Sequence, residues 1–314
     1  FNQGFAGLNN SSENILTDAS GNGKNGTLQN IALSGSTSNW VAPGGVVSGT
    51  ACTPCIVNIP DANFKNALLA NLAINLNNNG EIECSEAAVY TGAISVPSLN
   101  ISDLTGIEAF VNITSLNCHT NSLTSLNVSQ NIYLTDLSCY ENPLGSLNLV
   151  SNTALTSLQC SDNLLNTLDV SANTSLTYLS CGYNNLSSID LSTNTALVTL
   201  DISFCPLTSI DLTTNTNIES LNLWNCSLTS LDLSNNISLQ SFSCPGTLLT
   251  SLDLSNNPAL NQFTCYSNSQ LTSLNLANGN NTNLLGANFN ATLNPNLTCI
   301  QVDNVNYANT NWSA

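Results

Sequence analysis

Residues 113–133 read ITSLNCHTNSLTSLNVSQNIY and residues 134–154 read LTDLSCYENPLGSLNLVSNTA, so the same pattern occurs twice in succession. Apolar residues, a cysteine and an asparagine recur every 21 residues, and this period continues to about Leu276. A period of this length predicts a solenoid in which each copy forms one turn. Because a single turn cannot bury its apolar face alone, neighbouring turns must stack, and stacking creates a long regular surface without a deep cleft. Such a surface favours binding over catalysis.

Each turn contains two half-motifs, LxxLxC and LTSLDLS, and both alternate apolar with polar residues. Alternation of this kind is typical of a half-buried strand. We therefore expect two parallel ladders, a concave sheet from the first half-motif and an extended convex stretch from the second. A shortened turn from Val96 precedes the regular ones, an extra residue occurs near Ser269, and LLGANF and LTCIQV close the C-terminal end. The eight full turns begin at Ile113, Leu134, Leu155, Leu176, Leu197, Ile218, Leu239 and Leu260.

The consensus of the turns, LxxLxCxxNxLxxLDLSxN, resembles the leucine-rich repeat over about residues 56–314. This cysteine-bearing variant is similar to the secreted repeats of Bacteroidota and to the cysteine-ladder internalins of Listeria. The resemblance implies a mostly β fold, namely a right-handed leucine-rich repeat solenoid with a parallel β-sheet and a small α-helical, EF-hand-like N-terminal cap. It also implies a secreted or cell-surface bacterial protein.

The sequence divides into three regions. Residues 1–55 are rich in Gly, Asn and Ser and predict a small strand module or a linker, in which residues 18–28, DASGNGKNGTL, resemble part of the calcium edge of laminin-G folds. Residues 56–95 predict a helical cap, because the end of a solenoid needs an atypical terminal unit to cover it. Residues 96–314 contain the solenoid and its closing turns.

The helix expected in the cap follows Pro60 and Asp61, which are typical of a helix start. Four apolar residues after them recur at helical spacing, and we expect this stripe to pack in the core. They are Phe64, Leu68, Leu69 and Leu72.

Composition excludes several kinds of partner. Lys24 and Lys65 are the only basic residues among 314, against 19 acidic ones, and the formal net charge is −17. A chain without a basic patch is not expected to bind nucleic acid or an anionic membrane surface. The sequence contains no run of 18 apolar residues, so direct membrane insertion is not expected. It opens at FNQGF without the pattern of a signal peptide, and we interpret it as an excised or processed piece of a longer polypeptide.

Most of the 12 cysteines follow the repeat. In-register parallel strands point such side chains the same way, which suits a column of buried free thiols better than a chain of disulfides or a zinc site. Three cysteines stand outside the column near the cap, and either Cys52 with Cys55 or Cys55 with Cys84 could pair in an oxidising compartment. The pattern does not assign Cys299. The six cysteines in phase are Cys118, Cys139, Cys160, Cys181, Cys244 and Cys265.

The asparagine at the ninth position of each turn is expected to satisfy backbone groups at the bend. In two turns a cysteine takes this place, Cys205 and Cys226, and Ile202 and Leu223 then take the usual cysteine position, so the substitution is paired. The asparagines of this column are Asn121, Asn142, Asn163, Asn184 and Asn268.

Residues 75–86 of the cap, NLNNNGEIECSE, match the frame of an EF-hand loop. The early positions carry neutral amides in place of aspartates, which weakens a calcium site, so a metal-free capping turn and a calcium loop both remain open. The candidate ligands for calcium are Asn75, Asn77, Asn79, Glu81 and Glu86, with Gly80 at the tight turn and Glu83 as a further charge. No other cofactor is expected.

Outward positions of the second half-motif are nearly constant. Carboxylates one strand apart repel each other, so they must accept hydrogen bonds from neighbouring Ser or Thr, stay hydrated, or gather cations. We expect a hydrogen-bonded polar ladder. The column consists of Asp169, Asp190, Asp211, Asp232 and Asp253, with Asn127, Asn148 and Asn275 at its ends.

Outward positions of the first half-motif vary from turn to turn and collect aromatic and charged residues. Exposed aromatic rings on a Ser- and Asn-rich sheet are candidate anchors for a protein or a glycan. Tyr183 and Phe204 are expected at the edge just beyond this face. The candidate ligand-binding residues of the concave face are His119, Asp136, Tyr140, Tyr178, Asp201, Trp224 and Tyr266.

Three classes of function follow from these patterns. The first is an extracellular binding module that mediates cell-surface adhesion by binding protein or glycan through its concave face. The second is a rigid structural spacer or filament subunit of a larger surface adhesin. An enzyme is not expected, because the sequence shows no Ser/His/Asp set, P-loop or GxSxG motif, and an open sheet offers no enclosed site.

Overall fold

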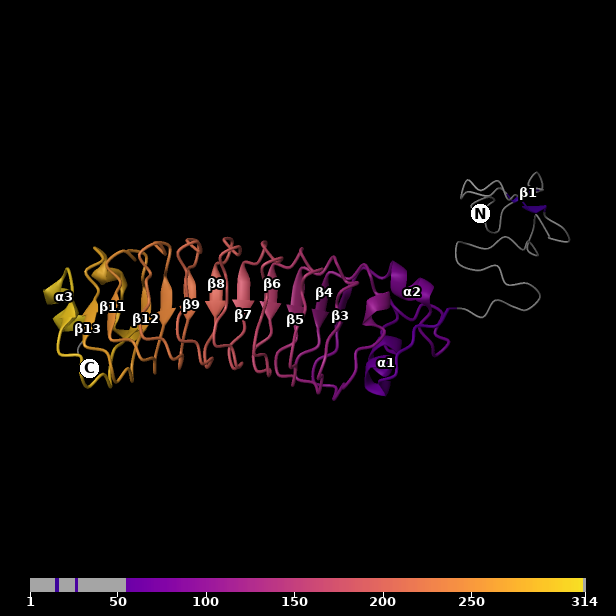
Figure 1. The fold of residues 1–314 in the computed structure, drawn as a ribbon, viewed down its shortest axis with the longest axis horizontal. Helices are drawn as coiled ribbons and strands as arrows, with labels where there is room; N and C mark the ends of the chain where they lie inside the picture. Colours follow the sequence, from indigo (N-terminus) through magenta and orange to yellow (C-terminus); the bar gives the residue numbers. More distant parts are fainter. Residues whose placement is uncertain (1–14, 17–25, 28–54, 313–314) are drawn as a thin grey trace. The chain divides into compact units, whose positions relative to one another are not determined.

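The computed structural model describes residues 15–16, 26–27 and 55–312 (Figure 1). The chain forms two compact units, residues 1–55 and 56–314. In the first unit, β1 (Ile15–Leu16) pairs antiparallel with β2 (Gly26–Thr27). The stretch that resembles a laminin-G edge lies outside the described residues except at β2.

The second unit is a solenoid built on one ten-stranded sheet. Leu116, Leu137 and Leu158 lie at the centres of successive strands and pair in register, and all three are buried. The expected mostly β solenoid with a parallel sheet is thereby confirmed. Its strands are β3 (Ala93–Ser95), β4 (Ser115–Asn117), β5 (Asp136–Ser138), β6 (Ser157–Gln159), β7 (Tyr178–Ser180), β8 (Thr199–Asp201), β9 (Ser220–Asn222), β10 (Ser241–Ser243), β12 (Gln262–Thr264) and β14 (Phe289–Asn290).

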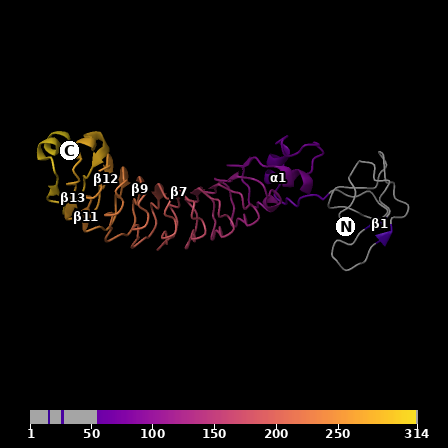
Figure 2. The same ribbon diagram turned by 90° about the horizontal axis from the view of Figure 1, so that it is seen from above.

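Within residues 55–312 a second ladder forms only at the C-terminal end, so the prediction of a convex ladder along the whole solenoid is wrong for most turns. Its strands are β11 (Ser251–Asp253), β13 (Ser273–Asn275) and β15 (Ile300–Gln301). Figure 2 shows the repeat unit as a curve, with β7, β9 and β12 on its inner side and β11 and β13 on its outer side. Turns spread apart on the outer side of a curve, and strand pairing requires a spacing of about 4.7–4.9 Å, so curvature disfavours a ladder there.

Two columns of buried asparagines replace strand pairing at the bends. In the first column, the Asn142 amide donates to the carbonyls of Cys118 and Cys139, both at 3.1 Å, and its oxygen accepts from the backbone N–H of Leu123 at 3.0 Å. The expected structural role of the ninth-position asparagine is confirmed.

The second column lies at the other bend and was not singled out from the sequence. The Asn173 amide donates to the carbonyls of Leu149 at 3.1 Å and Asn152 at 2.8 Å, and the pattern repeats in each turn. Each of these side chains therefore ties its turn to the preceding ones. The column includes Asn131, Asn152, Asn173, Asn194, Asn215, Asn236 and Asn257.

The cap contains α1 (Ala62–Leu69), α2 (Cys84–Val89) and the short 3-10 helix η1 (Ile107–Ala109). The Asp61 carboxylate caps α1 by accepting from the backbone N–H groups of Asn63 at 2.9 Å and Phe64 at 3.0 Å. Phe64 and Leu68 are buried, as expected. Leu72 is 71% exposed, so its assignment to the core was wrong. The helix ends before Leu72 is reached, and helical spacing no longer applies there.

The C-terminal end is closed by η2 (Asn281–Asn283), η3 (Gly286–Asn288) and α3 (Val305–Asn311). The ring of Trp312 stacks on Phe289 with centroids 4.6 Å apart, and its indole N–H donates to the Leu284 carbonyl at 2.7 Å. This helix was not anticipated. Within the described residues, every helix is too short or too polar to cross a membrane.

Candidate functional site

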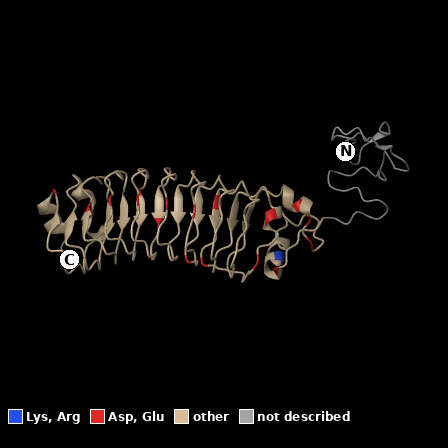
Figure 3. Ribbon diagram, viewed as in Figure 1, with Lys and Arg blue, Asp and Glu red and all other residues tan. Residues whose placement is uncertain are grey.

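Polar uncharged side chains dominate the concave sheet. Its outward positions are mostly Ser, Thr and Asn, as in β4, β9 and β10. Figure 3 shows acidic residues scattered along the repeat unit and basic colour only at the cap. In the described part of the chain the basic residue is Lys65, which pairs with Glu81 at 2.6 Å. The concave face therefore has no positive charge of its own.

Four aromatic side chains from turns four to eight form a continuous group, which we call the aromatic cluster: Tyr183, Phe204, Trp224 and Tyr266. The rings of Tyr183 and Phe204 stack with centroids 4.2 Å apart and an interplanar angle of 15°. Trp224 lies 5.0 Å from Phe204 and 6.3 Å from Tyr266. Tyr183 is 52% exposed and Trp224 is 40% exposed, so the cluster is open to solvent.

The bend after each concave strand contains one residue in the left-handed region. Tyr183 and Phe204 occupy this place with φ of 53° and 56°. In later turns it holds Asn225 and Gly246, residue types that adopt positive φ at low cost. A bulky residue at such a position is strained by about 1–3 kcal/mol. The bend would accept Gly or Asn more cheaply, so the two rings are not explained by the backbone.

Gly182 allows the Tyr183 bend to approach the next turn. A Cβ atom at this position would lie 2.7 Å from the Ser203 Oγ and 2.8 Å from the Ser203 carbonyl oxygen. Because the second contact is with backbone, it cannot be relieved by a rotamer change. The close packing of turns four and five, and with it the Tyr183–Phe204 stack, depends on glycine here.

A second, smaller group lies near the N-terminal end of the sheet. The His119 ring stacks on Tyr140 with centroids 4.2 Å apart, and its Nδ1 is 2.8 Å from the Thr120 hydroxyl. That hydroxyl donates to the Glu141 carboxylate at 2.8 Å. Asp136 lines the same shallow pocket as His119 and Tyr140, so these three predicted residues lie together.

The other predicted residues divide between the cluster and isolated positions. Trp224 and Tyr266 belong to the aromatic cluster. Tyr178 begins β7 and Asp201 ends β8, and the Asp201 carboxylate accepts from the Ser203 N–H at 2.9 Å. Within the described residues, the Tyr178 ring contacts none of the rings of the cluster. Tyr183 and Phe204 lie in the bends just beyond the strands, as expected, and Phe204 joins Tyr183 to Trp224.

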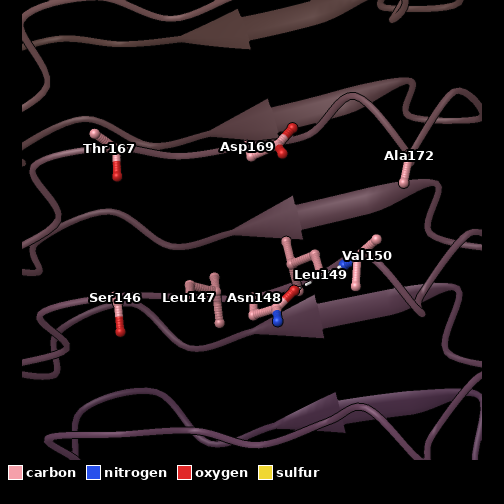
Figure 4. Close-up of a pocket in the computed structure, with 8 residues that line it drawn as sticks. All are labelled: Ser146, Leu147, Asn148, Leu149, Val150, Thr167, Asp169 and Ala172. Carbon is pink, nitrogen blue, oxygen red and sulfur yellow. Dashed lines mark hydrogen bonds between the residues drawn. The ribbon is translucent and has the colours of Figure 1, made fainter.

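The convex aspartates are held within their own turns. The Asp169 carboxylate accepts from the Ser171 N–H at 2.9 Å, and hydrogen bonds from Ser171 lower the pKa of Asp169. This is the expected hydrogen-bonded polar ladder. Figure 4 shows Asn148 and Asp169 on adjacent turns beside the exposed Val150, where they line a shallow groove. The same arrangement recurs at Asp190, Asp211, Asp232 and Asp253, where Ser192, Thr213, Ser234 and Ser255 are the donors.

The cysteine column is buried and its thiols are free, as predicted. Burial raises the pKa of Cys139 and Cys265 to about 12. Such thiols pack as small apolar groups and are poor nucleophiles. Cys299, left unassigned by the sequence, is free and exposed.

In the two turns where a cysteine replaces the ninth-position asparagine, the thiol still donates one hydrogen bond at the bend. The Cys226 thiol donates to the Ile202 carbonyl at 3.2 Å, and the Cys205 thiol donates to the Cys181 carbonyl at 3.5 Å. These carbonyls occupy the place of the Cys118 carbonyl that the Asn142 amide reaches. A thiol is a weaker donor than an amide, so the side-chain hydrogen bonds at the Phe204 and Trp224 bends are weaker than those of Asn184 at the Tyr183 bend.

Cys55 and Cys84 are both disulfide-bonded. The bridge between Ile56 and Glu83 brings the two cysteines side by side. This agrees with the alternative in which Cys55 pairs with Cys84 and ties the preceding segment to the cap.

The EF-hand-like loop is organised by its own hydrogen bonds. The Glu86 carboxylate accepts from the backbone N–H groups of Leu76 at 2.8 Å, Asn77 at 3.3 Å and Glu83 at 3.0 Å. The Glu83 carboxylate accepts from the amides of Asn77 and Asn79.

The remaining predicted calcium ligands of this loop, Glu81 and Asn75, differ from each other. Glu81 is paired with Lys65, and the Asn75 amide donates to the Leu69 carbonyl while its oxygen is buried without a partner among the described residues. A cation would have to displace the hydrogen bonds that Glu83 and Glu86 accept, whereas the Asn75 oxygen is open to one. Among the described residues, no three His, Cys, Asp or Glu side chains gather as a metal site.

Replacing Glu86 by alanine is expected to destabilise the cap by about 3 kcal/mol, because three backbone N–H groups, one of them buried, lose a charged acceptor. Thermal unfolding of Glu86→Ala and wild type measures the loss. Glu81→Ala, which removes an exposed ion pair, is the control and is expected to cost at most about 1 kcal/mol. Millimolar calcium is expected to leave both transitions unchanged; a calcium-dependent rise of the wild-type transition would show that the loop binds the ion.

Comparison with known proteins agrees with the fold. No family model and no curated protein matches the chain. The functional domain of internalin J from Listeria monocytogenes, which includes a cysteine ladder, is 28% identical over 81% of this chain and 72% of that one, with a TM-score of 0.59. A leucine-rich repeat protein of Leptospira interrogans is 18% identical over 73% and 71%, with a TM-score of 0.54. The chain thus has a leucine-rich repeat fold, a solenoid that offers an extended concave surface for binding.

Proposed function

We propose that the repeat unit is an extracellular module of cell-surface adhesion that binds a partner protein through its concave face. The aromatic cluster is the observation that supports this most directly. It gathers the exposed rings of Tyr183 and Trp224 on a face that otherwise consists of small polar residues. Exposed Tyr and Trp side chains provide large contact areas at low entropic cost, and they are enriched where partners bind most tightly.

The strained backbone supports the same proposal. Tyr183 and Phe204 keep bulky rings at positions of positive φ, where equivalent turns hold Thr120, Glu141, Asp162, Asn225 and Gly246. Strain of this kind is concentrated at functional sites, because only a use for the side chain offsets its cost.

The arrangement of the rings favours protein over glycan. A sugar binds an aromatic residue by stacking on a free ring face. Phe204 lies between Tyr183 at 4.2 Å and Trp224 at 5.0 Å, so this inner ring of the cluster offers its edge and not a free face. Edges and indole N–H groups suit the irregular apolar and polar surface of a protein.

Three features support an extracellular location. Cys55 and Cys84 are disulfide-bonded, which is typical of oxidising compartments. Charged residues make up only 7% of the chain, which leaves a surface of Asn, Ser and Thr. The functional domain of internalin J from Listeria monocytogenes, to which the chain is similar, also includes a cysteine ladder.

An array of extracellular proteins and glycans, probed with the full chain, tests the proposal. Trp224→Ala is expected to weaken binding of a protein by at least tenfold, as for a central aromatic anchor. Tyr133→Ala is the matched control, because Tyr133 is 55% exposed and lies outside the cluster. Equal binding by Trp224→Ala would exclude the concave aromatic cluster as the site, and a chain that binds nothing would favour the rigid spacer or filament subunit.

A further inference from the structure

The bends that follow the concave strands form one rim of the solenoid. Along this rim the left-handed residue changes from acidic to aromatic in successive turns. The left-handed residues of the bends are Thr120, Glu141, Asp162, Tyr183 and Phe204 in turns one to five. Neighbouring bends are joined through the backbone, since the Asp162 N–H donates to the Gly182 carbonyl at 2.9 Å and the Asn163 N–H to the Tyr183 carbonyl at 3.3 Å. Two carboxylates therefore stand next to the end of the aromatic stack.

Asp162 differs from the other acidic residues on this side. Asp136 accepts from Thr135, Glu141 from Thr120 and Asp201 from Ser203. Within the described residues the Asp162 carboxylate has neither a hydrogen-bond partner nor a cation near it. Its two carboxylate oxygens are therefore free to accept hydrogen bonds from solvent or from a ligand.

The Tyr183 ring offers the complementary surface. One face is covered by Phe204 at 4.2 Å with an angle of only 15°. Because these rings stack along the solenoid axis, the other face is directed towards turn three, where Asp162 occupies the equivalent bend. A shallow pocket on the same rim is lined by Glu141, Pro143, Asp162 and Leu164, over the buried Asn142 and Asn163. The pocket thus combines two carboxylates with short apolar walls, and Tyr183 occupies the equivalent bend of the next turn.

We propose that this rim binds an arginine side chain of the partner protein. The inference rests on the proposed function and specifies the chemistry of the partner. A guanidinium group is planar, so it can stack on Tyr183 while it donates paired hydrogen bonds to Asp162, with Glu141 adding charge. Charge complementarity supports a cationic group, because the chain carries −17 and the one described cation, Lys65, is already paired with Glu81.

The test uses the full chain labelled with ¹⁵N and titrated with N-acetyl-arginine amide, with NMR shifts followed at the bends of turns two to four. We expect saturable shifts confined to these turns. Asp162→Asn is expected to weaken binding by about tenfold or more, because a charge-assisted pair is lost. The substitution fits the backbone, since φ is 52° at this position and Asn tolerates positive φ.

Further variants separate a binding role from a structural one. Tyr183→Phe is expected to keep the affinity, because the ring face remains, whereas Tyr183→Asn loses it. Asp190→Asn, on the convex side, is the matched control and is expected to change nothing. The neutral isostere N-acetyl-citrulline amide is expected not to bind. Equal binding of citrulline, or unchanged affinity in Asp162→Asn, would overturn the inference.

Failure of the arginine site can be distinguished from failure of the proposed adhesion function. A protein partner whose binding depends on Trp224 but is indifferent to Asp162→Asn would leave the adhesion proposal in place and overturn the arginine site. Arginine binding that depends on Asp162, in a chain whose binding does not depend on Trp224, would support the rim site while excluding the aromatic cluster as the anchor.

Discussion

Asn194→Asp is expected to destabilise the repeat unit by at least about 4 kcal/mol at pH 7, because it places an unpaired charge in the interior. Asn194 is fully buried, and its amide donates to the carbonyls of Val170 at 3.0 Å and Asn173 at 2.9 Å. An ionised Asp has no donor, so its oxygens would face both carbonyls. Urea unfolding of the two chains measures the loss.

The effect should depend on pH in a defined direction. Burial raises the pKa of the introduced carboxyl above its unfolded value of about 3.9, and the protonated acid can donate to one carbonyl. The destabilisation should therefore be smallest near pH 4 and grow as the pH rises. Asn235→Asp makes the same chemical change at an exposed site whose amide reaches the Thr213 carbonyl at 3.3 Å. Similar losses in the two variants would contradict a structural role for the buried column.

The repeat period predicted the features that every turn shares. Leu116, Leu137 and Leu158 must face the same core because each lies 21 residues from the next, and the cysteine column follows by the same argument. Residues one period apart come into contact when the turns stack in register. The parallel sheet, the buried thiols and the closing turns could therefore be predicted from the sequence.

The sequence could not predict features that depend on the curvature of the solenoid, or that involve residue types as common in this chain as asparagine. The convex ladder was expected throughout, but the period does not state how far apart the outer strands lie, and pairing begins only at β11. The second asparagine column also recurs in the sequence, yet Asn is common on the surface of this chain, so the burial of Asn173 and its partners leaves no distinct signal.

The candidate site was predictable in part. Trp224 and Tyr266 were recognised because outward positions of the concave half-motif vary between turns. Tyr183 and Phe204 follow the strands by one residue more, where strand alternation no longer gives a direction for the side chain. Their positive φ sets that direction. The signal available in the sequence was their spacing of 21 residues, which places two aromatic side chains next to each other on adjacent turns.

The cysteine column should be chemically silent in the folded protein. Burial raises the pKa of Cys139, Cys226 and Cys265 to about 12, so at pH 8 about 10⁻⁴ of each thiol is ionised. An ordinary thiol with a pKa of about 8.5 is ionised to roughly a quarter, so each buried thiol should react with a thiol reagent at least a thousandfold more slowly. Of the nine cysteines that the structure describes as free, only the exposed Cys299 is expected to react rapidly.

Labelling with a disulfide reagent, followed by peptide mass spectrometry, identifies the reactive residues. Cys299→Ser is the control and should abolish the rapid phase at that site, whereas unfolding in denaturant should release the eight buried thiols together. Rapid native labelling of Cys160 or Cys181 would contradict the packed column.

The same shifts predict the response of stability to alkaline pH. Unfolded thiols lose their protons near pH 8.5, whereas the buried ones in the folded protein keep theirs to about pH 12, so the folded state binds more protons between these limits. Stability should therefore be fully present below about pH 8 and fall as the pH rises above it, by up to about 1.4 kcal/mol per thiol for each pH unit. Replacing Cys139 and Cys160 with alanine should make this decline shallower while lowering stability at neutral pH through lost packing. An unchanged slope in the double variant would mean that the buried thiols do not set the alkaline limit.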